Sequence, residues 1–312
     1  MVITFGESLI ALYPETRGRL EGRMPFVPHV AGAECNVAVG LSRLGVQVGY
    51  LGAVGPDPFG RLVRATLRGE GVEVSGLQTL DHPTALFFVE EYGLTPEPRV
   101  YYYRKGSAGS RWAVRPEDLE RLQDAQWLHT SGITFMLGEQ TRSSAETLVT
   151  KRSSRVVASL DINFRRRLAE PEEWRRVLEP RLSEFNVVFA SREELGAVFG
   201  ANKMDEIERL FPASDGQVLI VKEGAKGAWC QSGNGVLEVP AFDVANIVNV
   251  IGAGDGFAAG VIAGRLRGWD WQQAIKLGNL VGAFAVAHPG DFEGYPTQAE
   301  VEQYLGAQWV ER

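Results

Sequence analysis

The sequence predicts an α/β fold in which helices cover both faces of a mainly parallel central sheet. Short β-branched runs alternate with segments whose hydrophobic residues repeat at helical spacing. Of the 312 residues, 45% are hydrophobic and 23% are charged, which is the balance of a globular chain with a large core. The 36 glycines are typical of tight strand-to-helix turns and of loops that approach a ligand closely.

The alternation of β and α segments runs through most of the chain. The predicted strands are 46–54, 156–162, 187–190 and 218–221. The predicted helices are 36–44, 57–70, 172–184, 193–199 and 254–268. Alternation of this kind favours parallel strands, and parallel sheets bind ligands at the carboxyl ends of their strands.

Two stretches near the N-terminus break this alternation and are rich in β signals. They are 9–30 and 84–104, and within the second stretch 85–92 and 99–103 resemble two strands of a hairpin bridged by 93–98. We expect a small sheet that projects as a lid, built from about 9–32 and 84–105; an extension of the main sheet edge is the alternative. The chain contains no internal repeat or long linker, so residues 1–312 are expected to form a single domain.

Charge and composition exclude several classes of protein. The balance of 32 Lys+Arg against 39 Asp+Glu gives a net charge of −7, which disfavours a nucleic-acid partner. No apolar run approaches the ~18–20 residues of a membrane helix, and the first residues have no basic region, so we expect a cytoplasmic protein with no membrane partner. The two cysteines, Cys35 and Cys230, lie in apolar stretches and are expected to be buried thiols.

The most informative segment is Asn249-Val250-Ile251-Gly252-Ala253-Gly254-Asp255-Gly256-Phe257, where a β-branched run enters a turn of small residues and a helix begins. Successive amides of Gly252, Ala253 and Gly254 would point at one spot beside the helix N-terminus, which is a ready anion site. Asp255 then stands where a phosphate would arrive. The alternative is that Asp255 merely caps the helix.

A second glycine-bearing turn lies at Lys222-Glu223-Gly224-Ala225-Lys226-Gly227, between two apolar runs. On its own this pattern fits a hairpin with solvated charges as well as a ligand loop. The chain has no Walker P-loop, no His-Glu-x-x-His, no Cys-x-x-Cys and no Gly-x-Ser-x-Gly, and it has only four histidines. A histidine-rich metal site is therefore not expected.

Taken in order, these segments resemble the ribokinase-like (PfkB-type) family of carbohydrate kinases over essentially the whole chain. Gly32-Ala33-Glu34-Cys35-Asn36-Val37-Ala38 and Gly52-Ala53-Val54-Gly55-Pro56-Asp57 are similar to the first family signature, and Gly252-Ala253-Gly254-Asp255-Gly256-Phe257 to the second. The resemblance implies a three-layer α/β/α ribokinase-like fold with a β lid. It also implies ATP with Mg²⁺ and phosphorylation of a sugar hydroxyl.

The resemblance assigns roles residue by residue. It makes Asp255 the general base, which a helix N-terminus is expected to keep ionised at neutral pH, and it makes the amides of Gly252, Ala253 and Gly254 the groups that stabilise the transferred phosphoryl. Glu194 takes the position that organises Mg²⁺ through water, and Ser191 stands where the family has Asn. The implied nucleotide contacts are Asn163, Ser191, Lys222, Gly224, Ala225, Gly227, Gly252, Gly254 and Asn279. An ordinary polar helix residue is the alternative for Asn279.

One departure concerns a monovalent cation. Many relatives have Asp-Thr where this chain has Asn249-Val250. Asn249 keeps a carbonyl oxygen but loses the charge, which argues against potassium activation.

The segment Tyr101-Tyr102-Tyr103-Arg104-Lys105-Gly106 bears on the substrate. Strand alternation puts Tyr102 and Arg104 on one side, where a guanidinium suits a carboxylate; by composition alone, an aromatic hairpin with a solvated basic end fits better. Together with Asp161-Ile162-Asn163-Phe164-Arg165 it resembles the 2-keto-3-deoxygluconate kinase branch, which phosphorylates a sugar acid at its 6-hydroxyl. That branch implies substrate contacts from Gly32, Asn36, Phe87, Tyr102, Arg104, Ile133, Arg165 and Asp255, with Phe87 where the branch can have Tyr.

Two alternatives remain open at this point. A fructokinase or other neutral-sugar kinase shares both signatures, and a catalytically silent sugar sensor would share the fold but would not need Asp255. We also expect a homo-oligomer, because family members often pair through lid edges.

Overall fold

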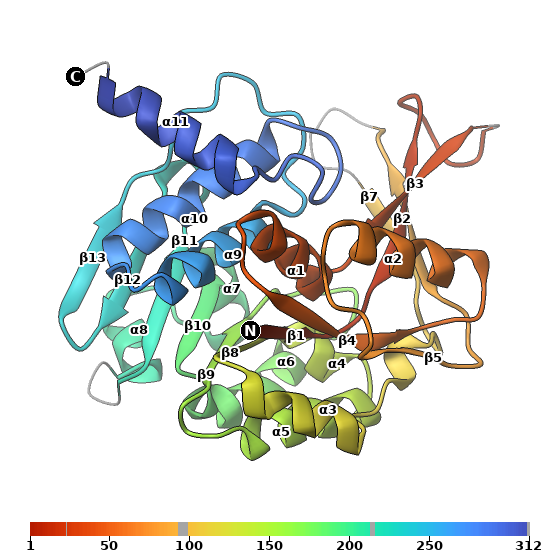
Figure 1. Ribbon diagram of the computed structural model, residues 1–312, viewed down its shortest axis with the longest axis horizontal. Helices are drawn as coiled ribbons and strands as arrows, with labels where there is room; N and C mark the ends of the chain where they lie inside the picture. Colours follow the sequence, from red (N-terminus) through yellow and green to blue (C-terminus); the bar gives the residue numbers. More distant parts are fainter. Residues whose placement is uncertain (23, 93–98, 213–215, 311–312) are drawn as a thin grey trace.

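A nine-stranded sheet forms the centre of the computed structural model, which describes residues 1–312 except residue 23 and residues 93–98, 213–215 and 311–312 (Figure 1). From edge to edge its strands are β13 (Gly235–Val239), β12 (Ala228–Ser232), β11 (Val218–Lys222), β10 (Val187–Ser191), β9 (Val157–Asp161), β8 (Trp127–Ser131), β1 (Val2–Phe5), β4 (Val48–Val54) and β5 (Leu77–Thr79). All neighbours from β11 to β5 are parallel, and β12 and β13 are antiparallel. The predicted fold class is confirmed.

Helices cover the two faces of this sheet, each over its own hydrophobic core. One face carries α1 (Ala33–Arg43), α2 (Pro58–Gly69), α9 (Ala253–Leu266), α10 (Trp271–Val286) and α11 (Gln298–Val310). The other carries α3 (Pro116–Glu120), α4 (Gly132–Met136), α5 (Glu139–Lys151), α6 (Pro171–Leu178), α7 (Arg192–Phe199) and α8 (Met204–Leu210). Short 3₁₀ helices are η1 (Gly109–Arg111), η2 (Arg121–Asp124), η3 (Glu179–Glu184) and η5 (Gly224–Lys226).

Local signals explain where several of these elements begin and end. Asp57 caps α2 by accepting from the Gly60 amide at 2.8 Å, with Pro58 in the first turn. The helix expected over 172–184 ends instead at Leu178 and continues as η3. Pro180 explains the change, because a proline lacks the amide that a continued α-helix would use.

A separate four-stranded sheet contains the two stretches that broke the alternation. Its order is β3 (Phe26–Ala31), β2 (Leu9–Pro14), β6 (Ala85–Glu90) and β7 (Arg99–Tyr103). Strands β6 and β7 form the expected antiparallel pair, and the bridge at 93–98 lies outside the described residues. The second sheet is therefore not an extension of the main one, and it stands beside α2 in Figure 1.

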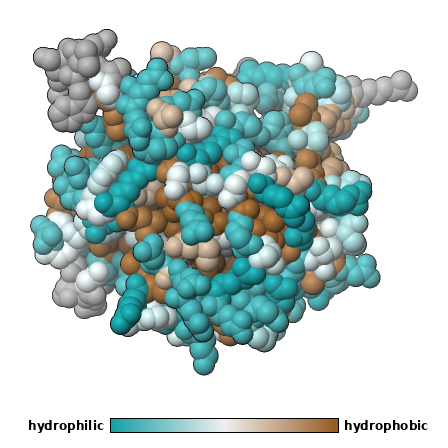
Figure 2. Space-filling view, in the orientation of Figure 1, coloured by the Kyte–Doolittle hydropathy of each residue, from teal (hydrophilic) through white to brown (hydrophobic). Residues whose placement is uncertain are grey.

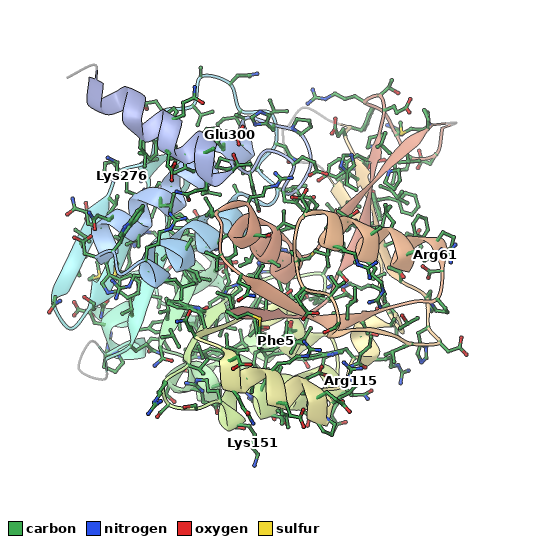
Figure 3. The ribbon with its side chains drawn as sticks, viewed as in Figure 1. Phe5, Arg61, Arg115, Lys151, Lys276 and Glu300 are labelled. Atoms are coloured by element: carbon green, nitrogen blue, oxygen red, sulfur yellow. The ribbon has the colours of Figure 1, made fainter. Side chains whose placement is uncertain are left out.

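Burial follows the layers. Phe5 lies inside the ribbon, whereas Arg61 and Lys151 extend from its outside (Figure 3). Figure 2 shows hydrophilic side chains over most of one face and a band of hydrophobic ones across its middle. Cys35 and Cys230 are buried free thiols, as predicted. Among the described residues, no helix has the length and apolar character that a membrane span requires.

Candidate active site

A cavity of about 980 Å³ lies where the carboxyl ends of the parallel strands face the small sheet. Most residues singled out from the sequence line it: Gly32, Asn36, Phe87, Tyr102, Arg104, Ile133, Asn163, Arg165, Ser191, Glu194, Lys222, Gly224, Gly252, Gly254 and Asp255. The lining does not include Ala225, Gly227, Ala253 or Asn279. One cavity thus joins the two ends of the predicted site.

The glycine-rich turn leads into α9 as expected. Gly252 is the residue before the helix and has φ 79°, in the left-handed region, and a Cβ there would overlap the carbonyl of Asp291. The helix begins at Ala253 and has no side-chain cap, so Asp255 is not its N-cap. The amides of the first turn therefore have no capping side chain; the Ala253 amide donates to the Val250 carbonyl at 3.5 Å, which leaves those of Gly254 and Asp255 available to an anion.

Two amide side chains hold the carboxylate of Asp255. Asn36, from α1, donates to Oδ2 at 2.8 Å, and Asn163, from the loop after β9, donates to Oδ1 at 3.2 Å. Asn163 has φ 47°, a strained conformation for a non-glycine residue that typically persists at functional sites. Residues from two distant segments thus fix the orientation of one carboxylate.

The charge state of Asp255 differs from the expectation. Burial, together with the charge of Asp161, raises the pKa of Asp255 to about 7, against the lowering effects of the Asn36 hydrogen bond, Lys222 and Arg165. The expectation that the helix N-terminus keeps it fully ionised at neutral pH is therefore wrong, because desolvation outweighs the helix dipole. A group with a pKa near 7 suits a general base at that pH.

The segment Gly290-Asp291-Phe292-Glu293-Gly294 also resembles the 2-keto-3-deoxygluconate kinase branch, which implies either that it closes over the site or that it forms a surface turn; the structure brings its Asp291 to the cavity. Asp291 lines the cavity from the segment after α10, lies 3.4 Å from the amide of Asn36, and accepts a hydrogen bond from the hydroxyl of Tyr13 on β2 at 2.9 Å. Burial raises the pKa of Asp291 to about 6.

The small sheet supplies the aromatic end of the cavity. Phe87 on β6 and Tyr102 on β7 contact each other with ring centroids 5.5 Å apart, and the guanidinium of Arg104 lies 5.1 Å from the Tyr102 ring. Tyr102 and Arg104 therefore share a side, as strand alternation predicted.

Arg104 already has an ionic partner. Its guanidinium forms a buried ion pair with Glu7, whose other carboxylate oxygen accepts from the hydroxyl of Ser107 at 2.8 Å. No motif in the sequence indicated a role for Glu7. The pair neutralises much of the charge that the sequence reasoning assigned to substrate binding.

The opposite wall combines Ile133 and Arg165. Ile133 lies in the first turn of α4. Glu34 on α1 accepts hydrogen bonds from Ser131 and Thr134 at this turn and so connects the two helices. Arg165 has no carboxylate within 4 Å in the described part of the chain. Its positive charge is therefore available to a ligand.

Ser191 and Glu194 form the start of α7. The hydroxyl of Ser191 accepts from the Glu194 amide at 3.1 Å, and the Glu194 carboxylate accepts from the amides of Ser191 and Phe164 at 2.7 and 2.8 Å. This capping box gives both side chains a structural use, and both also line the cavity.

The second glycine-bearing turn is a hairpin loop between β11 and β12, and only its start reaches the cavity. Gly224 lines the cavity, whereas Gly227, with φ 100°, packs against the backbone at Val239 and Pro240. Asn279 donates to the carbonyls of these two residues at 3.1 and 2.9 Å. Gly227 and Asn279 thus position this backbone and do not face the cavity.

Asn249 is occupied by backbone groups. Its amide donates to the Gly290 carbonyl at 2.9 Å, and its side-chain oxygen accepts from the Ile251 amide at 3.0 Å. The side chain closes the loop before the glycine-rich turn.

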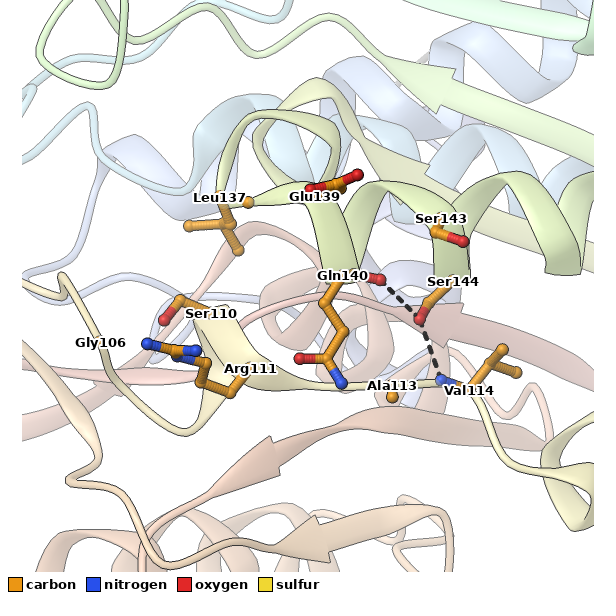
Figure 4. A pocket seen from close by; sticks show the side chains of 11 residues that line it. Gly106, Ser110, Arg111, Ala113, Val114, Leu137, Glu139, Gln140, Ser143 and Ser144 are labelled. Carbon is orange, nitrogen blue, oxygen red and sulfur yellow. Dashed lines mark hydrogen bonds between the residues drawn. The ribbon is translucent and has the colours of Figure 1, made fainter.

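A second cavity, of about 730 Å³, lies between η1 and the start of α5 and shares no lining residue with the first (Figure 4). Its buried hydroxyl, Ser144, accepts from the Val114 amide at 3.0 Å and donates to the Gln140 carbonyl at 2.8 Å. The Ser144 hydroxyl is therefore used to join α5 to the segment after η1.

Comparison with known proteins agrees with this geometry. The sequence profile of the pfkB family carbohydrate kinases matches residues 1–298. The chain is 32% identical to a 2-dehydro-3-deoxygluconokinase of Bacillus subtilis, covering 98% of this chain and 95% of that one. It is also 32% identical to a fructokinase of Escherichia coli, covering 96% and 98%. A putative ribokinase II from E. coli, solved with ATP and Mg²⁺, is 26% identical with a TM-score of 0.89, covering 98% and 99%.

Proposed function

Because the chain belongs to the pfkB family of carbohydrate kinases, we propose that it uses ATP to phosphorylate the 6-hydroxyl of 2-keto-3-deoxygluconate (2-dehydro-3-deoxy-D-gluconate). One observation carries the proposal: a single cavity runs from Tyr102 on the small sheet and Arg104 just after it to Asp255 and the turn at Gly252. A sugar held at the first end would present its terminal hydroxyl at the second.

Asp255 is the proposed general base. It would accept the proton of the 6-hydroxyl as that oxygen bonds to the γ-phosphorus and the bond from phosphorus to the β–γ bridging oxygen breaks, with ADP as the leaving group. Amides of Gly252, Ala253 and Gly254 would stabilise the charge on the transferred phosphoryl group. Asn36 and Asn163 would keep the carboxylate aimed at the hydroxyl.

ATP would extend from the glycine-rich turn past Lys222 to Gly224, beside the backbone that Asn279 holds. Mg²⁺ fits a cavity of this chemistry, because the Glu194 carboxylate and the side-chain oxygen of Asn163, which has no partner in the described part of the chain, are hard oxygen donors. The described residues contain no group of three metal-ligating side chains, which accords with an ion held mainly by phosphates and water. When bound, Mg²⁺ would offset phosphate charge.

Two arginines would supply the positive charge that suits a sugar acid, Arg104 at the small-sheet end and Arg165 from the opposite wall. Arg165 has no ionic partner among the described residues, and Arg104 retains the edge of its guanidinium that Glu7 leaves free. A charge-assisted contact from these groups distinguishes a sugar acid from a neutral hexose.

A specific observation also favours a second candidate, a fructokinase. Glu7 offsets the charge of Arg104, and Asp291 adds a carboxylate near Asn36, which suits the hydroxyls of a neutral sugar. The 32% identity to the E. coli fructokinase is the same as that to the first relative.

The test compares kcat/KM for 2-keto-3-deoxygluconate and for fructose in Arg104→Gln and Arg165→Gln, with Arg61→Gln as a surface control. A lost carboxylate contact should lower kcat/KM for the acid by ~10² and leave the value for fructose within about threefold. An equal fall in kcat/KM for both sugars would contradict acid recognition, because it would indicate a structural defect that affects the two substrates alike. If the unmodified protein turned over neither sugar, a catalytically silent sugar sensor would be favoured.

We further propose that the four-stranded sheet acts as a lid and that the protein forms a homo-oligomer. The lid proposal rests on Phe87, Tyr102 and Arg104, which cover the cavity from this sheet. The oligomer proposal rests on β3 and β7, whose outer edges have no partner strand among the described residues.

A further inference from the structure

Asp161 and Lys222 form an ion pair that the proposed reaction has not yet used. Asp161 ends β9 and Lys222 ends β11, with β10 between them, and Lys222 Nζ lies 2.6 Å from Asp161 Oδ2. Asp161 is 1% exposed, and its Oδ1 has no hydrogen-bond partner among the described residues. Within the described chain, this carboxylate therefore bonds only through its contact with Lys222.

The ammonium group of Lys222 stands at the glycine-rich turn. A Cβ built on Gly254 would lie 3.2 Å from Nζ, so the amine reaches the backbone that precedes Asp255. Lys222 also lines the main cavity. The pair thus places a positive charge beside the amides proposed to receive the phosphoryl group.

Such a pair is a poor device for stability. Desolvation of two charges offsets most of their attraction, and hydrophobic residues of similar volume often replace a buried pair at no loss of stability. A half-satisfied carboxylate such as Asp161 is more costly still. The arrangement points to a role in the reaction.

Several charged groups face this pair. They are Glu194 on α7, Asp255 on α9 and Arg165 after β9, and the titratable ring of His129 on β8 stays neutral because burial lowers its pKa to about 3. Burial lowers the pKa of Lys222, but the charges of Asp161 and Glu194 and the hydrogen bond to Asp161 outweigh it, so its pKa lies above the ordinary value. Burial raises the pKa of Asp161 to about 6.

We propose that Asp161 is a positioning residue, which keeps Lys222 protonated and holds its ammonium group at the Gly252–Gly254 turn, where it neutralises charge on the transferred phosphoryl group. The proposal rests on the proposed kinase reaction and adds to it a residue that acts through another. Without Asp161, Lys222 would be a buried cation beside the turn with no hydrogen-bonded counter-ion.

The first test needs no turnover. The chain has six lysines, so the ¹³Cε signal of Lys222 can be assigned with Lys222→Arg and titrated by NMR in the free protein. Lys222 should stay an ammonium group to pH 10. Asp161→Asn should lower the midpoint of the Lys222 titration by ~2 pH units or more, because burial lowers the pKa of the amine and the charge of Asp161 no longer opposes it. An unchanged midpoint would overturn the proposal.

The second test is a double-variant cycle in kcat. Asp161→Asn should lower kcat by ~10², whereas in a Lys222→Met background the same change should alter kcat by less than about threefold. Equal losses in both backgrounds would overturn the proposal. The double variant removes both charges, so it should fold at least as well as either single variant.

Asp118→Asn is the matched control, because Asp118 is also fully buried and pairs with an arginine, Arg115, away from the cavity. It should leave kcat within about threefold, and a loss as large as that of Asp161→Asn would attribute the effect to stability and overturn the proposal. Asp255→Asn tests the proposed base separately from the proposed role of Asp161. Retained turnover in Asp255→Asn would refute the base, whereas the Lys222 titration reports only on Asp161.

Discussion

The amide of Asn36 donates a hydrogen bond to the carboxylate of Asp255 at 2.8 Å and lies 3.4 Å from the carboxylate of Asp291. One side chain from α1 therefore sets the position of two acidic groups that come from α9 and from the segment after α10. This relationship links the first family signature to the second. The chemistry proposed for the site depends on it.

The first prediction concerns pH. Asp255 must be ionised to accept a proton, and its pKa is about 7, so kcat/KM should fall as the pH drops through that value. The loss between pH 8 and pH 6 should be about tenfold for a single group of this pKa. A pH–rate profile in excess ATP and Mg²⁺ measures it. A profile that is flat down to pH 5 would show that no group of this kind limits the reaction.

The second prediction concerns Asn36. Its hydrogen bond lowers the pKa of Asp255, so Asn36→Ala should move the acidic limb of the profile to higher pH by on the order of one unit. The plateau of kcat/KM should also fall, because the carboxylate loses a fixed donor. If the plateau falls while the limb stays in place, Asn36 contributes to binding and not to the charge state of Asp255.

The third prediction concerns stability. The pKa of Asp255 is raised above its unfolded value of 3.8, so the folded state binds the proton more tightly, and stability is lost as the pH rises from about 4 to about 7. Asp255→Asn should therefore raise the free energy of unfolding of the free protein by about 2–4 kcal/mol at pH 8, and by about half as much at pH 5.5. Urea unfolding at the two pH values measures the difference. A destabilised variant at pH 8 would contradict the account.

The fourth prediction compares two glycines with the same backbone conformation. Gly252 has φ 79° and faces the Asp291 carbonyl, whereas Gly45 has φ 76° and open space around its Cβ position. Gly45→Ala should cost only the left-handed strain of about 1 kcal/mol and leave kcat unchanged. Gly252→Ala should cost more and lower kcat by ~10² or more, since the turn must move. Thermal melts and initial rates measure both, and equal behaviour of the two variants would contradict a role for the close approach.

Local sequence predicted the turn at Gly252–Asp255 because a strand, a turn and a helix N-terminus are specified by neighbouring residues. It did not predict Glu7, and for the segment at 290–294 it left a surface turn open, because tertiary packing alone brings Glu7 to Arg104 and Asp291 to Asn36. The direction in which a side chain points is likewise not visible in the sequence. Gly227 and Asn279 lie in the segments expected to bind the nucleotide, and tertiary packing directs both to the backbone at 239–240.

The charge of Asp255 shows this limit most clearly. The sequence places it at a helix N-terminus, which favours the ionised form, but burial and the neighbouring Asp161 dominate. Neither burial nor this neighbour is visible in a linear motif. The break between α6 and η3, by contrast, follows from Pro180 and was available from the sequence.

The proposed sugar-acid kinase reaction is tested by ADP release from ATP and Mg²⁺ with 2-keto-3-deoxygluconate, fructose, ribose and adenosine offered separately, using Asp255→Asn as the control. The account predicts turnover with the sugar acid well above that with the other three compounds, and its loss in the variant. Faster turnover with fructose or ribose would contradict acid recognition by Arg104 and Arg165, and turnover that survives in Asp255→Asn would contradict the proposed base.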